Sequence, residues 1–131
     1  MPRATLTISS KNYSSWSLRG WLLCKMAGIE FDEAHVDPDS AANRQELLLL
    51  SPSVRVPRLE RGTMAVWDTL AIAEYLHETF PEAGLYPADV TQRALCRAIS
   101  GEMHSGFYNL RSALPMNLKA RHRAFKIFSG A

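Results

Sequence analysis

Residues 56–69 have the sequence VPRLERGTMAVWDT, which predicts a β-hairpin that leads directly into a helix. Two strand-like runs flank Arg61-Gly62, a pair of residues suited to a tight turn. Asp68 and Thr69 follow, and both are residues that favour a helix N-cap. Apolar residues then recur at helical spacing, namely Ile72, Tyr75, Leu76 and Phe80. The sheet is therefore expected to end in two antiparallel strands, with a helix packed beside them.

The chain before the hairpin alternates strands and helices. Ser14, Ser15 and Ser17 are each suited to cap the first helix, and Gly28 is suited to end it. Because the first two strands flank that helix, they should run parallel. The elements expected before the hairpin are a strand, a helix, a strand and a shorter helix, at residues 4–8, about 14–28, 31–36 and about 41–50.

Pro81 should end the helix that follows the hairpin, and the alternation of strands and helices is expected to stop there. Proline, glycine and aspartate recur in residues 81–90, as is typical of a linker. A long helix is then predicted from Val90 to Leu114, and Pro115 should end it. The order β-α-β-α-β-β-α predicts an α/β fold, a thioredoxin-like layer with a mixed four-stranded sheet. We therefore expect an α/β domain, a linker and the start of an all-helical domain, at residues 1–82, 83–89 and 90–131.

Composition and charge narrow the possible functions. Apolar residues make up 47% of the 131 residues, and the net charge is only +2, so neither nucleic acid nor a membrane is expected as partner. Cys24 and Cys96 lie far apart and form no CxxC motif, which favours reduced thiols in the cytoplasm and argues against a thiol–disulfide oxidoreductase. The four histidines lack ligand spacing, so no metal site is predicted.

Three motifs together resemble the signatures of the soluble glutathione transferases. They are NYSSWSLR at residues 12–19, Val56-Pro57, and DTLAIAEYL at residues 68–76. The resemblance covers about residues 4–115 and is closest to serine-type, zeta-like bacterial members. The segments EMHSGF and LPMN are similar to the first helix of the second domain in one bacterial subgroup, at residues 102–107 and 114–117.

The first motif concerns activation of the glutathione sulfur. A free thiol has a pKa of about 8.5, so little of it is ionised at neutral pH. The hydroxyl of a serine at a helix N-terminus can donate a hydrogen bond to the sulfur, while the free amides of the helix add positive potential. The resemblance implies Ser14 as the catalytic donor, with Ser15 as the second choice. Plain helix capping is the alternative role for both.

The other two motifs are expected to bind glutathione. The resemblance implies a cis Val56-Pro57 bond, with the Val56 backbone pairing with the tripeptide. Thr69 would hold the γ-glutamyl carboxylate, Asp68 would attract the ammonium group, and Arg55 would meet the glycyl carboxylate. The alternatives are an ordinary trans proline in a turn, a plain N-cap and an exposed arginine.

The predicted long helix carries the candidates for the second substrate. His104, Phe107 and Arg111 lie three and four residues apart, hence on one face of a continuous helix. By analogy with the family, that face would line the pocket for the electrophile. The alternative is that Phe107 belongs to the core and His104 to the surface.

The resemblance thus implies a detoxifying glutathione transferase with glutathione as co-substrate and an electrophilic small molecule as substrate. The complete protein is expected to form a homodimer in the cytoplasm. The alternatives are a non-catalytic glutathione-binding or interaction module and an inactive fragment. Trp16 stands where zeta-class members have cysteine. That cysteine is associated with maleylacetoacetate isomerisation, so the resemblance does not predict this reaction for the present sequence.

The helical part departs from the family in length. The family's second domain is a bundle of several helices, whereas this sequence stops soon after one, so a chain truncated in that domain is expected. The long helix would then expose an apolar face built from Leu95, Ile99, Met103 and Leu110. Low stability and low activity are expected of such a chain.

Overall fold

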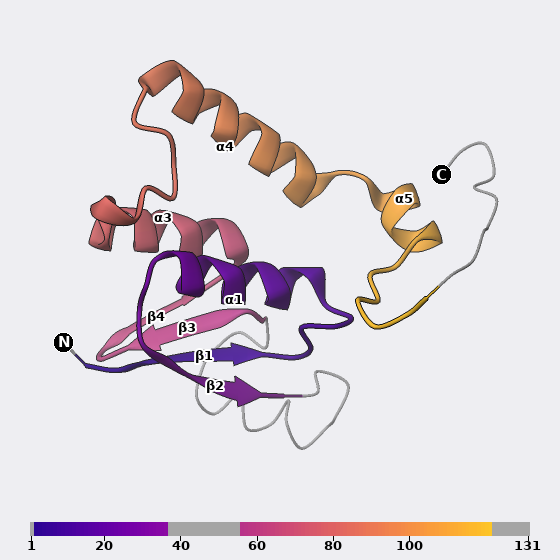
Figure 1. Cartoon of the computed structure of the whole chain (residues 1–131), viewed down its shortest axis with the longest axis horizontal. Helices are drawn as coiled ribbons and strands as arrows, with labels where there is room; N and C mark the ends of the chain where they lie inside the picture. Colours follow the sequence, from indigo (N-terminus) through magenta and orange to yellow (C-terminus); the bar gives the residue numbers. More distant parts are fainter. Residues whose placement is uncertain (1, 37–55, 122–131) are drawn as a thin grey trace.

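The computed structural model describes residues 2–36 and 56–121. In chain order the elements are β1 (Ala4–Ile8), α1 (Ser15–Met26), β2 (Phe31–His35), β3 (Arg58–Arg61), β4 (Met64–Trp67), α3 (Thr69–Thr79), the short 3-10 helix η1 (Pro81–Ala83), α4 (Val90–Ser105) and α5 (Tyr108–Ala113) (Figure 1). The helix predicted near residues 41–50 and the candidate Arg55 lie outside the described residues.

The sheet has the mixed topology that the sequence predicts. Its four strands follow the order β2-β1-β3-β4. The pair β1 and β2 is parallel, whereas β3 runs antiparallel to both β1 and β4. The core side chains Leu6, Ile8 and Leu59 are fully buried. This arrangement confirms the thioredoxin-like fold.

Helices α1 and α3 cover one face of this sheet (Figure 1). Ile72 and Leu76 of α3 enter the core beside Cys24 of α1. Burial raises the pKa of the Cys24 thiol to about 12, so this cysteine is part of the packing rather than a nucleophile. Gly20 lets α1 approach Pro57, because an added Cβ would lie only 2.6 Å from the proline Cβ.

The prediction of one continuous helix from Val90 to Leu114 is wrong, because the helix is interrupted between Ser105 and Tyr108, where the chain bends. The Gly106 amide closes the last turn of α4 by donating to the Glu102 carbonyl at 2.8 Å. Phe107 then adopts φ 61°, a left-handed conformation that ends the helix path. A Cβ at Gly106 would lie 2.8 Å from that same carbonyl oxygen, so this bend requires glycine.

Helix α4 lies on the side of α1 and α3 that faces away from the sheet (Figure 1). None of its residues is buried. Leu95, Ile99 and Met103 of α4 are exposed, as predicted. Leu110 is also exposed but belongs to α5, so it does not share their helix face. Among the described residues, no helix combines the length and apolar content needed to cross a bilayer.

Candidate functional site

The three sequence motifs meet at one edge of the sheet, where β1 ends. Thr7 near the end of β1 pairs with Arg58, the first residue of β3, and Arg58 pairs with Trp67, the last residue of β4. The loop that leads to α1, the Val56-Pro57 pair before β3 and the start of α3 after β4 therefore share this edge. The N-termini of two helices point their free amides there.

The start of α1 is built by serines. The Ser10 hydroxyl accepts hydrogen bonds from the amides of Asn12 and Tyr13, at 3.2 Å each, and so shapes the turn before the helix. Ser14 is the N-cap, and its hydroxyl accepts from the Ser17 amide at 3.2 Å. The predicted cap at Ser14 is thereby confirmed. A capping hydroxyl still has its own proton to donate.

Ser17, the third candidate cap, has a different role. Its side chain is fully buried, and its hydroxyl accepts from the Ser9 amide at 3.1 Å. The Ser9 hydroxyl lies 3.2 Å from it. These bonds fix the end of β1 against the first turn of α1. Sequence reasoning missed this role because burial depends on how the helix lies on the sheet.

The start of α3 has an unusual backbone and an unused hydroxyl. Asp68 is the N-cap with φ 78°, a strained value for a residue other than glycine. One carboxylate oxygen accepts from the Ala71 amide at 3.4 Å. Thr69 is 7% exposed, and its hydroxyl oxygen has no hydrogen-bond partner within the described residues. Buried polar groups are normally paired, so this hydroxyl is a candidate ligand contact.

The Val56-Pro57 bond is cis, as the resemblance implies. Pro57 is fully buried against Gly20, whereas Val56 is partly exposed at the edge. This pair lies between the start of α1 and the start of α3 in the order of the sheet.

A cluster around Trp16 ties α4 and α5 to this edge. The Nε2 atom of His104 lies 3.2 Å from a carboxylate oxygen of Asp68. The rings of His104 and Trp16 also pack in a T-shaped arrangement, with 4.9 Å between their centroids. The guanidinium groups of Arg19 and Arg111 lie 4.3 Å and 4.6 Å from the Trp16 centroid.

The electrophile-pocket candidates therefore divide into two groups. His104 and Arg111 both reach Trp16, but from separate helices rather than from one helix face. Phe107 lies in the bend between these helices and is 47% exposed. Among residues 2–36 and 56–121, no group of histidine, cysteine, aspartate or glutamate side chains is arranged to hold a metal ion.

Comparison with known proteins identifies the family. The model of the glutathione S-transferase N-terminal domain matches residues 13–79, about half of the chain. The chain belongs to the glutathione S-transferase family. Its motifs at Ser14, Pro57 and Asp68 are thus part of the glutathione transferase N-terminal domain.

Several members of the family are similar over most of the length of this chain. A probable maleylacetoacetate isomerase of Caenorhabditis elegans is 32% identical over 84% of the chain and 50% of its own length. The maleylacetoacetate isomerase of Rattus norvegicus is 34% identical over 75% of the chain and 46% of its own length. The chain therefore spans about half the length of the curated relatives it matches.

Solved structures agree with the fold. A glutathione transferase homologue from Burkholderia GL BGR1, crystallised with bound glutathione, superposes with a TM-score of 0.72 at 28% identity. The match covers 86% of this chain and 62% of that chain.

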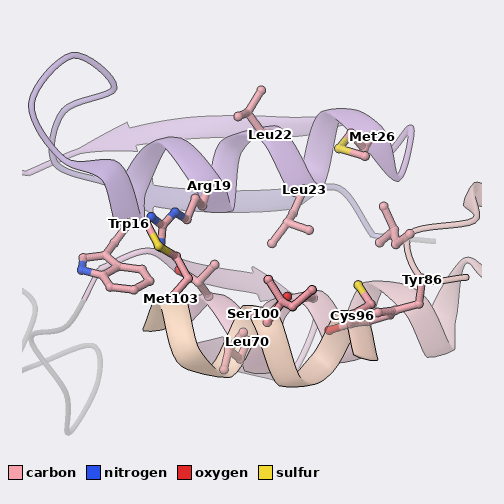
Figure 2. A pocket seen from close by; sticks show the side chains of 14 residues that line it. Trp16, Arg19, Leu22, Leu23, Met26, Leu70, Tyr86, Cys96, Ser100 and Met103 are labelled. Atoms are coloured by element: carbon pink, nitrogen blue, oxygen red, sulfur yellow. The ribbon is translucent and has the colours of Figure 1, made fainter. Parts of the chain in front are cut away.

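Two cavities flank the Trp16 cluster. The α1–α3–α4 cavity, of about 430 Å³, is mainly apolar, and Figure 2 shows Leu23, Leu70 and Met103 along it. The α1–α5 cavity, of about 540 Å³, lies between the start of α1 and α5 and is lined by Ser15 and Arg111.

Sequence reasoning missed Trp16 and Arg19 as site residues. The signal for Arg19 was its position four residues after Ser15, on the same helix face.

Proposed function

We propose that the protein is a glutathione transferase that ionises the glutathione thiol and adds the sulfur to an electrophilic carbon. The Ser14 hydroxyl would donate a hydrogen bond to the sulfur, while its oxygen still accepts the hydrogen bond from the Ser17 amide. Capping and catalysis are therefore compatible at one residue. The first amides of α1 add positive potential that favours the thiolate.

The observation that carries this proposal is the buried Thr69 hydroxyl, which has no hydrogen-bond partner in the described part of the chain and lies beside the strained Asp68. A γ-glutamyl carboxylate would accept from this hydroxyl and from the first amides of α3. Asp68 uses one oxygen for Ala71 and the other for His104, and lone pairs remain for the γ-glutamyl ammonium group. The Val56 backbone would align the peptide, and Arg55 would bind its glycyl carboxylate.

The reaction needs no covalent enzyme intermediate. The thiolate forms a carbon–sulfur bond. In a substitution, the bond to the leaving group breaks and its electron pair departs with that group. In an addition, the π electron pair of the activated double bond moves onto the activating group, and a proton from solvent is then taken up. Positioning of the two substrates and stabilisation of the thiolate supply the rate. Trp16 replaces the zeta-class cysteine, so the proposal is transfer rather than isomerisation.

The proposal extends to domains, assembly and location. Residues 1–82 would form the glutathione-binding domain and residues 90–131 the start of the helical domain, with 83–89 as linker. The absence of buried residues in α4 supports this division. The complete enzyme would be a homodimer. A cytoplasmic location is supported by the free thiols of Cys24 and Cys96.

The first test is turnover of Ser14 variants with glutathione and an activated aryl chloride. Ser14→Ala should lower kcat/KM about ten- to a hundredfold, since a hydrogen bond to a charged group contributes about 1.5–3 kcal/mol. Glutathione binding, measured by calorimetry, should persist. Ser14→Thr keeps both the cap and the hydroxyl donor, so it should retain most turnover.

Two controls separate catalysis from capping. Ser14→Asp caps the helix well but offers no hydroxyl proton, so it should fold normally and lose turnover. Ser15→Ala should lose much less turnover than Ser14→Ala. Equal turnover in the wild type, Ser14→Ala and Ser15→Ala would rule out serine activation. Glutathione binding without turnover in the wild type would favour the non-catalytic module, and no binding would favour an inactive fragment.

A further inference from the structure

The α1–α5 cavity has a charge pattern that the proposed glutathione contacts do not use. Ser15 and Arg19 face it from α1, and Arg111 faces it from α5. Its other walls are mainly apolar or aromatic, among them Tyr13, Tyr108 and Met116. No aspartate or glutamate lines it within the described residues. The cavity therefore combines apolar walls with two cationic groups.

The two guanidinium groups are held near each other at a cost. Both pack on the Trp16 ring, and the pKa of Arg19 is lowered by burial and then by the charge of Arg111. Like charges repel, and contact with the Trp16 ring compensates part of this repulsion. Among residues 2–36 and 56–121, no carboxylate forms an ion pair with Arg19 or Arg111. An anion bound between them would relieve the repulsion.

The cavity that the two arginines line lies beside the start of α1, where the glutathione sulfur is expected. Ser15 lines the cavity and directly follows Ser14, so a molecule in the cavity would lie beside the first turn of α1. Arg19 is one turn further along the same helix face. A substrate with an anionic end at the arginines would thus present its apolar body to the start of α1.

We propose that the α1–α5 cavity binds the electrophilic substrate and selects one that carries a carboxylate, which Arg19 and Arg111 hold. This inference rests on the proposed transferase function and specifies its second substrate. Guanidinium groups suit this task because their planar N–H donors match the two oxygens of a carboxylate.

The test compares two electrophiles that differ only in charge, a chloronitrobenzoate and the matching chloronitrobenzamide. In both, the glutathione sulfur bonds to the ring carbon that bears chlorine, the carbon–chlorine bond breaks, and chloride leaves with the electron pair. The thiol proton goes to solvent. Rates are divided by the uncatalysed rate of each compound with glutathione, so that intrinsic reactivity cancels.

The wild type should prefer the benzoate. In Arg19→Gln and Arg111→Gln, the KM for the benzoate should rise about tenfold or more, while the KM values for the benzamide and for glutathione change less than about twofold. Arg111→Lys keeps the charge and should retain part of the preference. Arg3→Gln removes an equal charge from an exposed pair with Asp32 and should leave the preference unchanged.

Three results would overturn the proposal. Equal losses for both electrophiles would mean that the arginines only hold α5 in place. A higher KM for glutathione would mean that they bind the tripeptide's own carboxylate. Unchanged selectivity would mean that they bind neither substrate.

Binding of the benzoate without glutathione, measured by tryptophan fluorescence, keeps the proposal testable if turnover is absent. Arginine-dependent binding without any thiolate formation would leave the cavity assignment standing and reject the transferase function. Binding that does not depend on Arg19 or Arg111 would reject the cavity assignment.

Discussion

Single residues at this site combine a structural and a chemical role. Ser14 caps α1 through its oxygen lone pair, and its proton stays available for a ligand. Asp68 likewise caps α3 while its second oxygen faces His104. The predictions that Ser14 and Asp68 are N-caps are therefore confirmed, and capping is compatible with the proposed chemistry.

His104 gives a prediction about a single residue, because it would affect glutathione binding through its contact with Asp68. Since two acceptors cannot pair, the Nε2–H group of His104 donates the hydrogen bond that the Asp68 carboxylate accepts. His104→Ala should raise the KM for glutathione about two- to tenfold, the equivalent of one ordinary hydrogen bond. The kcat at saturating glutathione should change little.

The conservative control is His104→Gln, whose amide can donate from nearly the same position. It should restore the KM for glutathione towards the wild-type value in steady-state assays. If glutamine behaves like alanine, the contact with Asp68 is not the reason for the loss.

At the scale of elements, α1 depends on a close contact at Gly20. An added Cβ would lie 2.6 Å and 2.8 Å from two atoms of the Pro57 ring, which is itself buried. Gly20→Ala should therefore lower the free energy of unfolding by about 1–3 kcal/mol, despite the better helix propensity of alanine. Urea denaturation followed by circular dichroism measures this change.

Gly101 in α4 is the matched control, because an added Cβ there meets no atom within 4 Å. Gly101→Ala should be neutral or raise the free energy of unfolding by up to about 1 kcal/mol. Equal effects at both glycines would show that the approach of α1 to Pro57 is not tight in solution.

Most elements could be predicted because their signals are local. Alternation marks β1, serine and aspartate mark the starts of α1 and α3, and Arg61-Gly62 marks the hairpin turn. The bend at Gly106 was missed because Phe107 adopts a left-handed backbone that its side chain does not favour. At the bend, the Gly106 amide donates to the Glu102 carbonyl, and a Cβ on Gly106 would lie 2.8 Å from that oxygen.

At the scale of the whole molecule, the fold brings the three motifs to one edge. Sequence reasoning could name Ser14, Pro57 and Asp68, because the order and spacing of their three motifs together resemble those of the family. It could not find the contacts of Trp16 with His104, Arg19 and Arg111, since these depend on how α4 and α5 pack against α1. The candidate roles of Arg55 stay predictions, because this residue lies outside the described part of the chain.

The central claim is that this edge of the fold ionises the glutathione sulfur, and ultraviolet absorbance of the bound thiolate tests it most directly. In a pH titration of the glutathione complex, the wild type should form thiolate with a pKa below the value of about 8.5 for a free thiol. Ser14→Ala should raise the pKa of the bound sulfur by about 1–2 units, and Ser15→Ala should not. A bound sulfur that stays protonated at neutral pH in the wild type, or that titrates identically in all three proteins, would contradict the account.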